Sequence, residues 1–215
     1  MHTKVIYIPL DERPCNKVFP SKLFRTDTFQ IISPDEAIYG YKEKPADLES
    51  LDLFIQKHAT SADSMVISLD FFLYGGLVAS RIHEETQEKL KKRMQVLQNI
   101  QLQNPKLKIF AFSTIMRVPQ YNSLECDMPY LKEYGVSIFT KGYLEHKKKL
   151  HLLTEHEQTT LDGLDIPTHY LEDFLRRRKL NLEMILQGIS YVETGVFCEF
   201  SILQDDSSPY GYTAM

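Results

Sequence analysis

The sequence alternates short apolar runs with longer stretches of helical periodicity, and this alternation restricts the fold more than any other feature. Runs that read as strands occupy residues 4–10, 29–32, 65–69, 107–112, 136–139 and 196–203. Stretches with a helical spacing of apolar residues lie between most of them, at 46–58, 84–103, 123–134 and over much of 142–195. Strands that alternate with helices are typical of βαβ units, whose strands run parallel. We therefore expect an α/β fold with a mainly parallel sheet and flanking helices.

Two architectures fit this pattern, a Rossmann-like open sheet and part of a (β/α) barrel. The six predicted strands are fewer than the eight that close such a barrel. The chain has 215 residues and no repeat, low-complexity tract or flexible linker, so residues 1–215 are expected to form a single domain. Only a short loop follows the last predicted strand, where a covering helix is expected. We therefore expect the chain to be the N-terminal part of a longer protein.

Composition argues against several classes of function. The formal net charge is −4, so no general electrostatic attraction to nucleic acid or to an anionic membrane is expected. No stretch approaches the roughly 20 apolar residues that cross a bilayer, and the N-terminus lacks a signal-peptide pattern. Three scattered cysteines, Cys15, Cys126 and Cys198, form no CxxC motif. They are expected to be reduced thiols of a cytoplasmic protein.

Polar side chains cluster where four of the predicted strands end. The clusters are Asp11, Glu12 and Arg13; Asp70 with Tyr74; Arg117; and Asp205 with Asp206. In a parallel sheet or a barrel these strand ends share one edge, so side chains from distant parts of the sequence converge there. Carboxyl groups in one cleft shift one another's pKa values, and one of them can stay protonated as a general acid while another stays ionised. The four aspartates are therefore the candidate catalytic residues.

The stretch 64–81 is the most informative of these clusters. A buried strand ends at Asp70, and Tyr74, Gly75 and Gly76 follow before Arg81 closes an apolar segment. A glycine turn beside a carboxylate at a sheet edge lets a ligand approach closely. The alternative interpretation is that Asp70 caps a turn which the glycines merely permit.

Asp205 and Asp206 are adjacent, and adjacent residues on a regular strand point to opposite faces. Both reach one cleft only if the strand has ended before them, as the following Ser-Ser-Pro sequence indicates. A helix cap is the alternative role for this pair.

Arg13, Arg81 and Arg117 are candidate ligand contacts, because a guanidinium group binds a carboxylate or a phosphate through paired hydrogen bonds. The alternative for Arg13 and Arg117 is a salt bridge to Asp11 or Asp70 that shapes the loops, and the same alternative applies to Arg81.

The sequence points to no cofactor. Three histidines recur every five residues, at 146, 151 and 156, whereas zinc motifs on a helix use a spacing of four. Phosphate-loop, dinucleotide-binding, nucleophile-elbow and HExxH signatures are absent. A divalent cation held by oxygens of Asp11, Asp70 and Asp205 is the alternative that the acidic clusters leave open.

Four blocks of sequence carry a resemblance to a known family. They are IPLDERPCN (8–16), ISLDFFLYGGLVASR (67–81), FSTIMRVP (112–119) and LQDDSSPYG (203–211). Together they resemble the bacterial family catalogued as domain of unknown function 4127, whose members are longer than this chain. The resemblance implies an α/β protein and brings no established reaction. Its motif positions correspond to Asp11, Arg13, Asp70, Tyr74, Gly75, Gly76, Arg81, Arg117, Asp205, Asp206 and Gly211.

From these residues we expect a hydrolase that acts on a carbohydrate-like substrate through carboxylates at the carboxyl edge of the sheet. Two alternatives stay open: a metal-dependent hydrolase with an aspartate cluster, and a noncatalytic small-molecule or sugar-binding domain. The candidate substrate-binding residues are Arg13, Tyr74, Gly75, Gly76, Arg81, Arg117 and Tyr210. The expected partner is a small-molecule or sugar ligand, with self-association of the chain through an exposed sheet edge or face.

Overall fold

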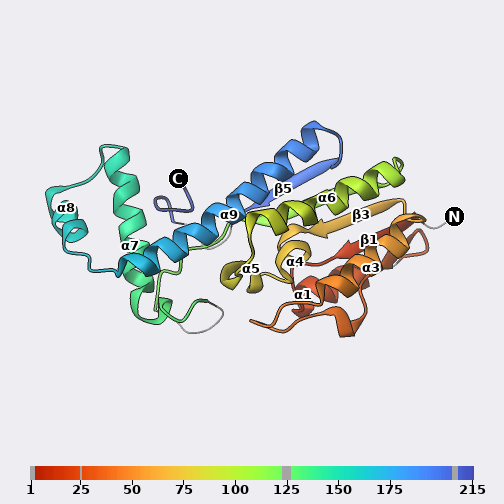
Figure 1. Cartoon of the computed structure of the whole chain (residues 1–215), viewed down its shortest axis with the longest axis horizontal. Helices are drawn as coiled ribbons and strands as arrows, with labels where there is room; N and C mark the ends of the chain where they lie inside the picture. Colours follow the sequence, from red (N-terminus) through yellow and green to blue (C-terminus); the bar gives the residue numbers. More distant parts are fainter. Residues whose placement is uncertain (1–2, 25, 123–126, 205–207) are drawn as a thin grey trace. The chain divides into compact units, whose positions relative to one another are not determined.

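The computed structural model of the chain describes residues 3–24, 26–122, 127–204 and 208–215. The chain divides into two compact units. We call Met1–Thr114 with Leu180–Leu203 the sheet unit, and Ile115–Lys179 with Gln204–Met215 the helical unit. The strands are β1 (Thr3–Ile8), β2 (Phe29–Ile32), β3 (Ser64–Ser68), β4 (Lys108–Thr114) and β5 (Glu199–Leu203) (Figure 1). The helices are α1 (Pro14–Lys17), α2 (Phe19–Leu23), the 3-10 helix η1 (Glu36–Ile38), α3 (Leu48–Ala59), α4 (Leu69–Tyr74), α5 (Ala79–Ile82), α6 (Gln87–Gln103), α7 (Leu131–Lys149), α8 (Glu155–Asp162) and α9 (Thr168–Glu193).

The sheet unit contains one five-stranded sheet in the order β2-β1-β3-β4-β5, and every neighbouring pair runs parallel. Among the described residues β2 and β5 are its two edges, so the sheet is open. The expected α/β fold with a parallel sheet and flanking helices is confirmed.

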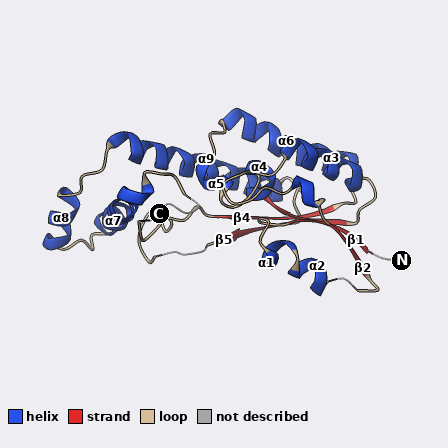
Figure 2. Cartoon of the chain, turned by 90° about the horizontal axis from the view of Figure 1, so that it is seen from below, coloured by secondary structure: helices blue, strands red, loops and turns tan. Residues whose placement is uncertain are grey.

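The two faces of the sheet are covered unequally. Alternate side chains of the central strands, such as Ile6, Met65 and Ile109, are fully buried beneath α3, α6 and the part of α9 that belongs to the sheet unit (Figure 2). Their neighbours Tyr7 and Val66 point to the opposite face and are only half-buried. On that face lie α1 and α2, neither of which has a buried residue. The core of the unit is therefore on the side of α3 and α6.

Local capping fixes where the long helices begin. The side chain of Asp47 accepts hydrogen bonds from the backbone N–H groups of Glu49 and Ser50, both at 3.1 Å, at the start of α3. Thr86 caps α6 in the same way. These helices confirm the predictions for 46–58 and 84–103, apart from shifts of up to three residues at their ends.

An arginine ties three helices of the sheet unit together. Arg93 on α6 forms two hydrogen bonds of 2.9 Å with the carboxylate of Asp52 on α3. The same guanidinium donates to the backbone carbonyl of Phe72 on α4. The paired contact with Asp52 holds the guanidinium in one orientation. Its hydrogen bonds to Phe72 therefore fix α4, which carries Asp70, relative to α3 and α6.

The helical unit has its own small core, formed by Met116, Val118, Leu131, Ile138 and Phe174. Asp173 on α9 accepts hydrogen bonds from Tyr130, at 2.9 Å, and from the fully buried Arg177. A capping box begins α8, where the side chains of Thr154 and Glu157 bond to each other's backbone N–H groups.

The predictions around α7 are partly wrong. The helix predicted at 123–134 is helical, among the described residues, only from Leu131, because residues 127–130 form a bend and a turn. Residues 136–139, predicted as a strand, lie inside α7, and Gly135 lies within that helix rather than beyond a helix end. Leu131, Gly135, Ile138 and Gly142 share its buried side at helical spacing, so packing outweighs the preference of a short apolar run for strand. Within the stretch 142–195, predicted to be largely helical, α9 runs without interruption from Thr168 to Glu193.

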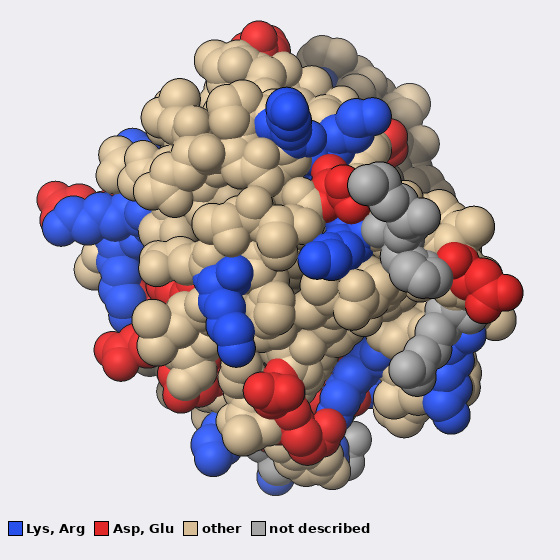
Figure 3. Space-filling view, turned by 90° about the vertical axis from the view of Figure 1, so that its right-hand side faces the viewer, with Lys and Arg blue, Asp and Glu red and all other residues tan. Residues whose placement is uncertain are grey.

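Helices of the described chain are all too short or too polar to cross a membrane. Basic and acidic side chains are interspersed over the face drawn in Figure 3, which carries no extended region of one sign.

Candidate functional site

The strand order reverses between β1 and β3. From β1 the chain passes to β2 at one edge of the sheet, and it then returns to place β3 on the other side of β1. The α1–α2 segment and α3 accordingly lie on opposite faces (Figure 2). In open α/β sheets, ligands bind outside the carboxyl ends of the strands at such a reversal. Ile8 of β1 pairs with Ile67 of β3, and the third residue after each of them is an aspartate, Asp11 or Asp70.

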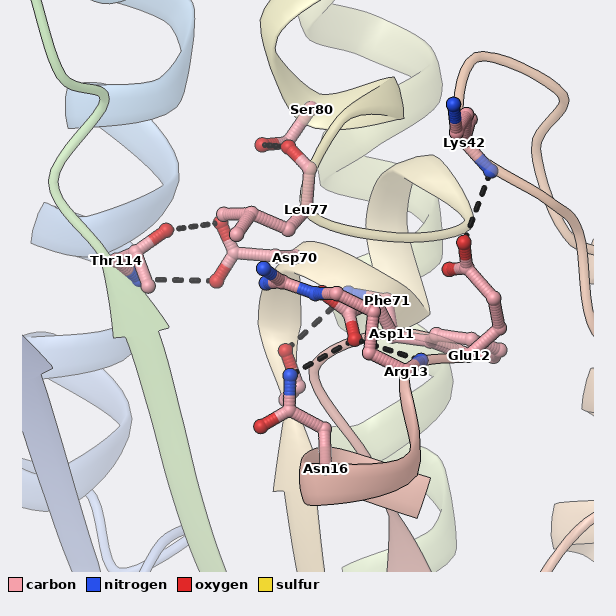
Figure 4. Close-up of polar contacts among 11 residues, drawn as sticks. Asp11, Glu12, Arg13, Asn16, Lys42, Asp70, Phe71, Leu77, Ser80 and Thr114 are labelled. Atoms are coloured by element: carbon pink, nitrogen blue, oxygen red, sulfur yellow. Dashed lines mark hydrogen bonds and ion pairs between the residues drawn. The ribbon is translucent and has the colours of Figure 1, made fainter. Parts of the chain in front are cut away.

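Asp11 is held by its own loop. One carboxylate oxygen accepts from Nε and Nη2 of Arg13, at 2.9 and 2.6 Å. The other accepts from the Arg13 backbone N–H, at 3.0 Å, and from the amide of Asn16, at 2.8 Å (Figure 4). Asp11 is 3% exposed, whereas the side chain of Arg13 is 55% exposed. The carboxylate therefore fixes the start of α1 and presents the Arg13 guanidinium to solvent. The side-chain hydrogen bond to Asp11 raises the pKa of Arg13.

Glu12, the second acid of this cluster, takes a different direction. Its carboxylate accepts a 2.9 Å hydrogen bond from the backbone N–H of Lys42 (Figure 4). Lys42 has a φ of 50°, so the contact stabilises a turn that non-glycine residues rarely adopt. Glu12 thus connects the loop after β1 to the turn before α3.

Asp70 is the second residue of α4, not a loop residue after the strand as predicted, because Ser68 caps a helix that begins at Leu69. Its carboxyl accepts hydrogen bonds from the Thr114 backbone N–H at 2.9 Å, the Thr114 hydroxyl at 2.8 Å and the Ser113 hydroxyl at 3.2 Å. Asp70 is 2% exposed. Burial raises its pKa, and the hydrogen bonds from Thr114 and Ser113 oppose that shift.

The hydrogen-bond partners of Asp70 accommodate both of its protonation states. The backbone N–H of Thr114 can only donate, so the oxygen that it contacts must accept. The other oxygen meets the Thr114 hydroxyl, which donates to a carboxylate and accepts from a carboxylic acid. A neutral Asp70 therefore keeps these contacts, and the partners found for it in the described ranges are uncharged.

The loop after α4 shows how the two glycines differ. Gly75 ends the helix with a φ of 90°, and a side chain there would come within 2.6 Å of the backbone N of Ala46. Gly76 has a φ of 141°, and a Cβ atom on it would meet nothing within 4 Å. Gly75 is thus required for close packing of the chain, while the space beside Gly76 is open.

Tyr74 and Arg81 lie on either side of these glycines, at the end of α4 and on α5. The hydroxyl of Tyr74 is buried and has no hydrogen-bond partner in the described part of the chain. Its ring centroid lies 4.5 Å from that of His83, and burial raises the pKa of Tyr74. Arg81 is half-buried.

The remaining candidates belong to the helical unit or to undescribed residues. Arg117 forms an ion pair of 3.0 Å with Asp127, not the predicted bridge to Asp11 or Asp70. The ring of Tyr210 packs edge-on against Tyr143, and the backbone N–H of Gly211 donates to His146 at 3.1 Å. Asp205 and Asp206 lie outside the described residues.

Sequence reasoning missed the partners of the two aspartates and one buried pair. Asn16 and Thr114 had a signal, because each lies within a block that resembles the family. Thr114 is the last residue of β4, and Asn16 lies on α1 in the segment that follows β1. The buried pair of His83 and Asn181 had none, since these residues are 98 positions apart and bond at 3.0 Å only in the folded chain. The amide of Asn181 also donates to the backbone carbonyl of Ser80, at 2.8 Å.

Within the described ranges, no group of three or more His, Cys, Asp or Glu side chains is arranged to hold a metal ion. Asp205, one of the three expected cation ligands, is outside those ranges.

The strand order and the pair of aspartates define a doubly wound α/β protein with a carboxyl-bearing site at the reversal of its sheet. A family model described as "Protein of unknown function (DUF4127)" matches residues 5–215, so the chain belongs to this family and the resemblance seen in its motifs is confirmed. No curated protein and no solved structure shows significant similarity to the chain.

Proposed function

We propose that the chain is a hydrolase that acts on a carbohydrate-like substrate at the edge of the sheet beyond β1 and β3. One observation carries the proposal: neighbouring strands deliver two carboxyl groups into contrasting surroundings. Asp11 is ion-paired with Arg13, whereas Asp70 is buried among uncharged donors and has a raised pKa. Glycosidic hydrolysis requires one carboxylic acid and one carboxylate, which is the combination that these surroundings favour.

In this proposal Asp70 is the general acid that protonates the leaving oxygen. Asp11 is the carboxylate on the opposite side of the scissile bond, where it takes a proton from the water that attacks the anomeric carbon as the bond to the leaving oxygen breaks. The exposed side of the Arg13 guanidinium donates to substrate hydroxyls, and the open space beside Gly76 admits the ligand. Asp205 and Asp206 stay candidates for the same chemistry from the sequence alone.

A noncatalytic sugar-binding domain is the second candidate, and the burial of Asp70 favours it. At 2% exposure, with its hydrogen bonds going to β4, Asp70 also serves to hold α4 against that strand. In that case Arg13 and the loop of Gly76 bind the ligand, and no bond of the ligand is cleaved.

Hydrolysis of a panel of chromogenic glycosides by the chain tests the proposal. We expect turnover of at least one glycoside, and a loss of about 100-fold or more in kcat for Asp70→Asn and for Asp11→Asn. Asp27→Asn removes an exposed carboxylate of the sheet unit and is the matched control, with unchanged activity expected. Circular dichroism of each variant establishes that it is folded.

The other outcomes separate the alternatives. Saturable binding of a sugar without hydrolysis would establish the noncatalytic domain instead. Metal-dependent cleavage of p-nitrophenyl phosphate, with no activity on any glycoside, would overturn both sugar-directed functions.

We assign this activity to the cytoplasm. Cys15 and Cys198 are free and exposed thiols, which fits a reducing compartment.

A further inference from the structure

A cavity of the sheet unit lies beside the edge strand β2, between that strand and α1–α2. Its volume is about 720 Å³, which is in the usual range for small-molecule sites. Lys17, Ser21 and Lys22 line it from the α1–α2 segment, and Ser33 and Tyr39 line it from the chain that follows β2. Asp11 and Asp70 do not line it, so this cavity is separate from the site of the proposed hydrolase.

The charged groups of this cavity have one sign. Lys17 and Lys22 are the charged side chains among its described lining residues, and no carboxylate is among them. Lys17 is held in place, since its ammonium group lies 4.4 Å from the ring centroid of Tyr39 and pairs with Glu36. The side chain of Glu36 is 83% exposed, so an anion competes with a largely solvated carboxylate for Lys17.

The hydroxyl groups of the cavity supply further donors. The Ser21 and Ser33 hydroxyls lie 3.3 Å apart, so one anionic oxygen can be reached by both. The Tyr39 hydroxyl is buried and has no hydrogen-bond partner among the described residues. A buried hydroxyl without a partner lowers the stability of a fold, so this hydroxyl gains a hydrogen bond from any ligand or water that reaches it from the cavity.

One wall of the cavity is apolar, formed by Val18, Phe29, Ile31 and Pro34. Phe29 and Ile31 also line an adjoining space of about 260 Å³ against the half-buried face of the sheet. A ligand that fills the cavity therefore has an apolar part beside its charged group.

We propose that this cavity binds a small molecule that carries an oxyanion, either a phosphate or a carboxylate, on an apolar or aromatic body. Lys17 and Lys22 neutralise the oxyanion, the hydroxyls of Ser21, Ser33 and Tyr39 donate to it, and Phe29 and Ile31 contact the body.

Titration of the chain with phenyl phosphate, benzoate and the uncharged benzyl alcohol tests this site. We expect at least one of the two anions to bind, with NMR shift changes at the backbone amides of Ser21, Gln30 and Ser33, and much weaker binding of benzyl alcohol. Preference for phenyl phosphate identifies a phosphate ligand, and preference for benzoate identifies a carboxylate. No binding of either anion at millimolar concentration would overturn the proposal.

Variants show whether the binding uses these side chains. Loss of two charged contacts in Lys17→Gln/Lys22→Gln should weaken binding of the preferred anion about ten-fold or more. Lys91→Gln on α6, which lies on the other face of the sheet, is the matched control and should leave the affinity unchanged. Equal affinity in the double variant and the parent chain would place the anion elsewhere and refute the site.

Tyr39→Phe separates ligand binding from stability. Because its hydroxyl has no partner to lose in the part of the chain that the structure describes, the variant should unfold at the same or a higher temperature than the parent chain. Its affinity for the preferred anion should fall several-fold. Unchanged affinity in this variant would contradict the proposed hydrogen bond from Tyr39.

Discussion

Asp70 at the start of α4 accepts hydrogen bonds from both the backbone N–H and the hydroxyl of Thr114 at the end of β4, at 2.9 and 2.8 Å. The two residues are 44 positions apart, and the contact is buried. One carboxyl group therefore positions a short helix against a neighbouring strand and is also the leading candidate for a general acid.

Removal of the Thr114 hydroxyl should weaken this connection. Thr114→Val keeps the β-branched shape and the backbone N–H but deletes one donor to a buried carboxyl group. We expect a loss of about 1.5–3 kcal/mol in the free energy of unfolding, measured by urea denaturation. Thr60→Val, at an exposed turn after α3, is the control and should be close to neutral. Similar losses in the two variants would show that the Asp70 contact contributes little.

The raised pKa of Asp70 makes the stability of the chain depend on pH. In the pH range between the ordinary aspartate pKa, about 4, and the raised value, the folded chain holds a proton that the unfolded chain has lost. This contribution to stability is fully present below about pH 4 and is lost as the pH rises through the raised pKa.

Asp70→Asn has no proton to lose and keeps a neutral side chain at every pH. Its stability relative to the parent chain should therefore increase as the pH rises from 4 toward 8, measured by urea denaturation across the series. A difference that stays constant with pH would show that the pKa of Asp70 is the same in the folded and unfolded chains.

Glu157 in the helical unit should give the opposite pH dependence. The side chain of Lys147 and the backbone N–H of Thr154 donate hydrogen bonds to the Glu157 carboxylate. These hydrogen bonds lower the pKa of Glu157 to about 2. Its contribution to stability is present above the ordinary glutamate pKa and is lost as the pH falls through the folded value.

We therefore expect Glu157→Gln to destabilise α8 at neutral pH and to match the parent chain more closely near pH 2. Amide hydrogen exchange in residues 155–162 is the measurement. Glu155→Gln, on the exposed first turn of the same helix, is the control. If exchange in both variants has the same pH dependence, the capping interaction of Glu157 is not its cause.

The two glycines after α4 should differ in their tolerance of a side chain. Both have positive φ values, so alanine is strained at either position by about 1–2 kcal/mol. Only at Gly75 does a Cβ atom also collide with backbone, that of Ala46. Gly75→Ala should therefore lower the melting temperature more than Gly76→Ala, which is its matched control. Equal melting temperatures would show that the chain around Ala46 moves without cost.

Much of the fold was predictable because its elements are locally encoded. The apolar run at 65–69 and the amphipathic stretch at 84–103 are apparent from near neighbours alone, and β3 and α6 confirm them. The prediction for the run at 136–139 fails for the same reason, since its four residues suit a strand until the helical packing of Leu131 and Ile138 is taken into account.

The candidate site was predictable only in part. That polar residues follow strand ends is a property of the sequence, and Asp11 and Asp70 do follow neighbouring strands. Arg117 follows β4 as well, yet it belongs to the helical unit and pairs with Asp127. Its partner is ten positions away, and nothing in local periodicity distinguishes such a pair from one with a distant acid.

The sequence by itself determined most of the strands and the long helices, that the strands are parallel, and which acids follow them. Tertiary structure alone decided the order β2-β1-β3-β4-β5, which brings Asp11 and Asp70 to one reversal of the sheet, and it supplied Thr114 as the partner of Asp70. The physical reason is the sequence distance over which the deciding contacts act. Secondary structure follows from contacts within a few residues. Strand order and the burial of Asp70 depend instead on which apolar surfaces, far apart in the sequence, pack against each other and are removed from water.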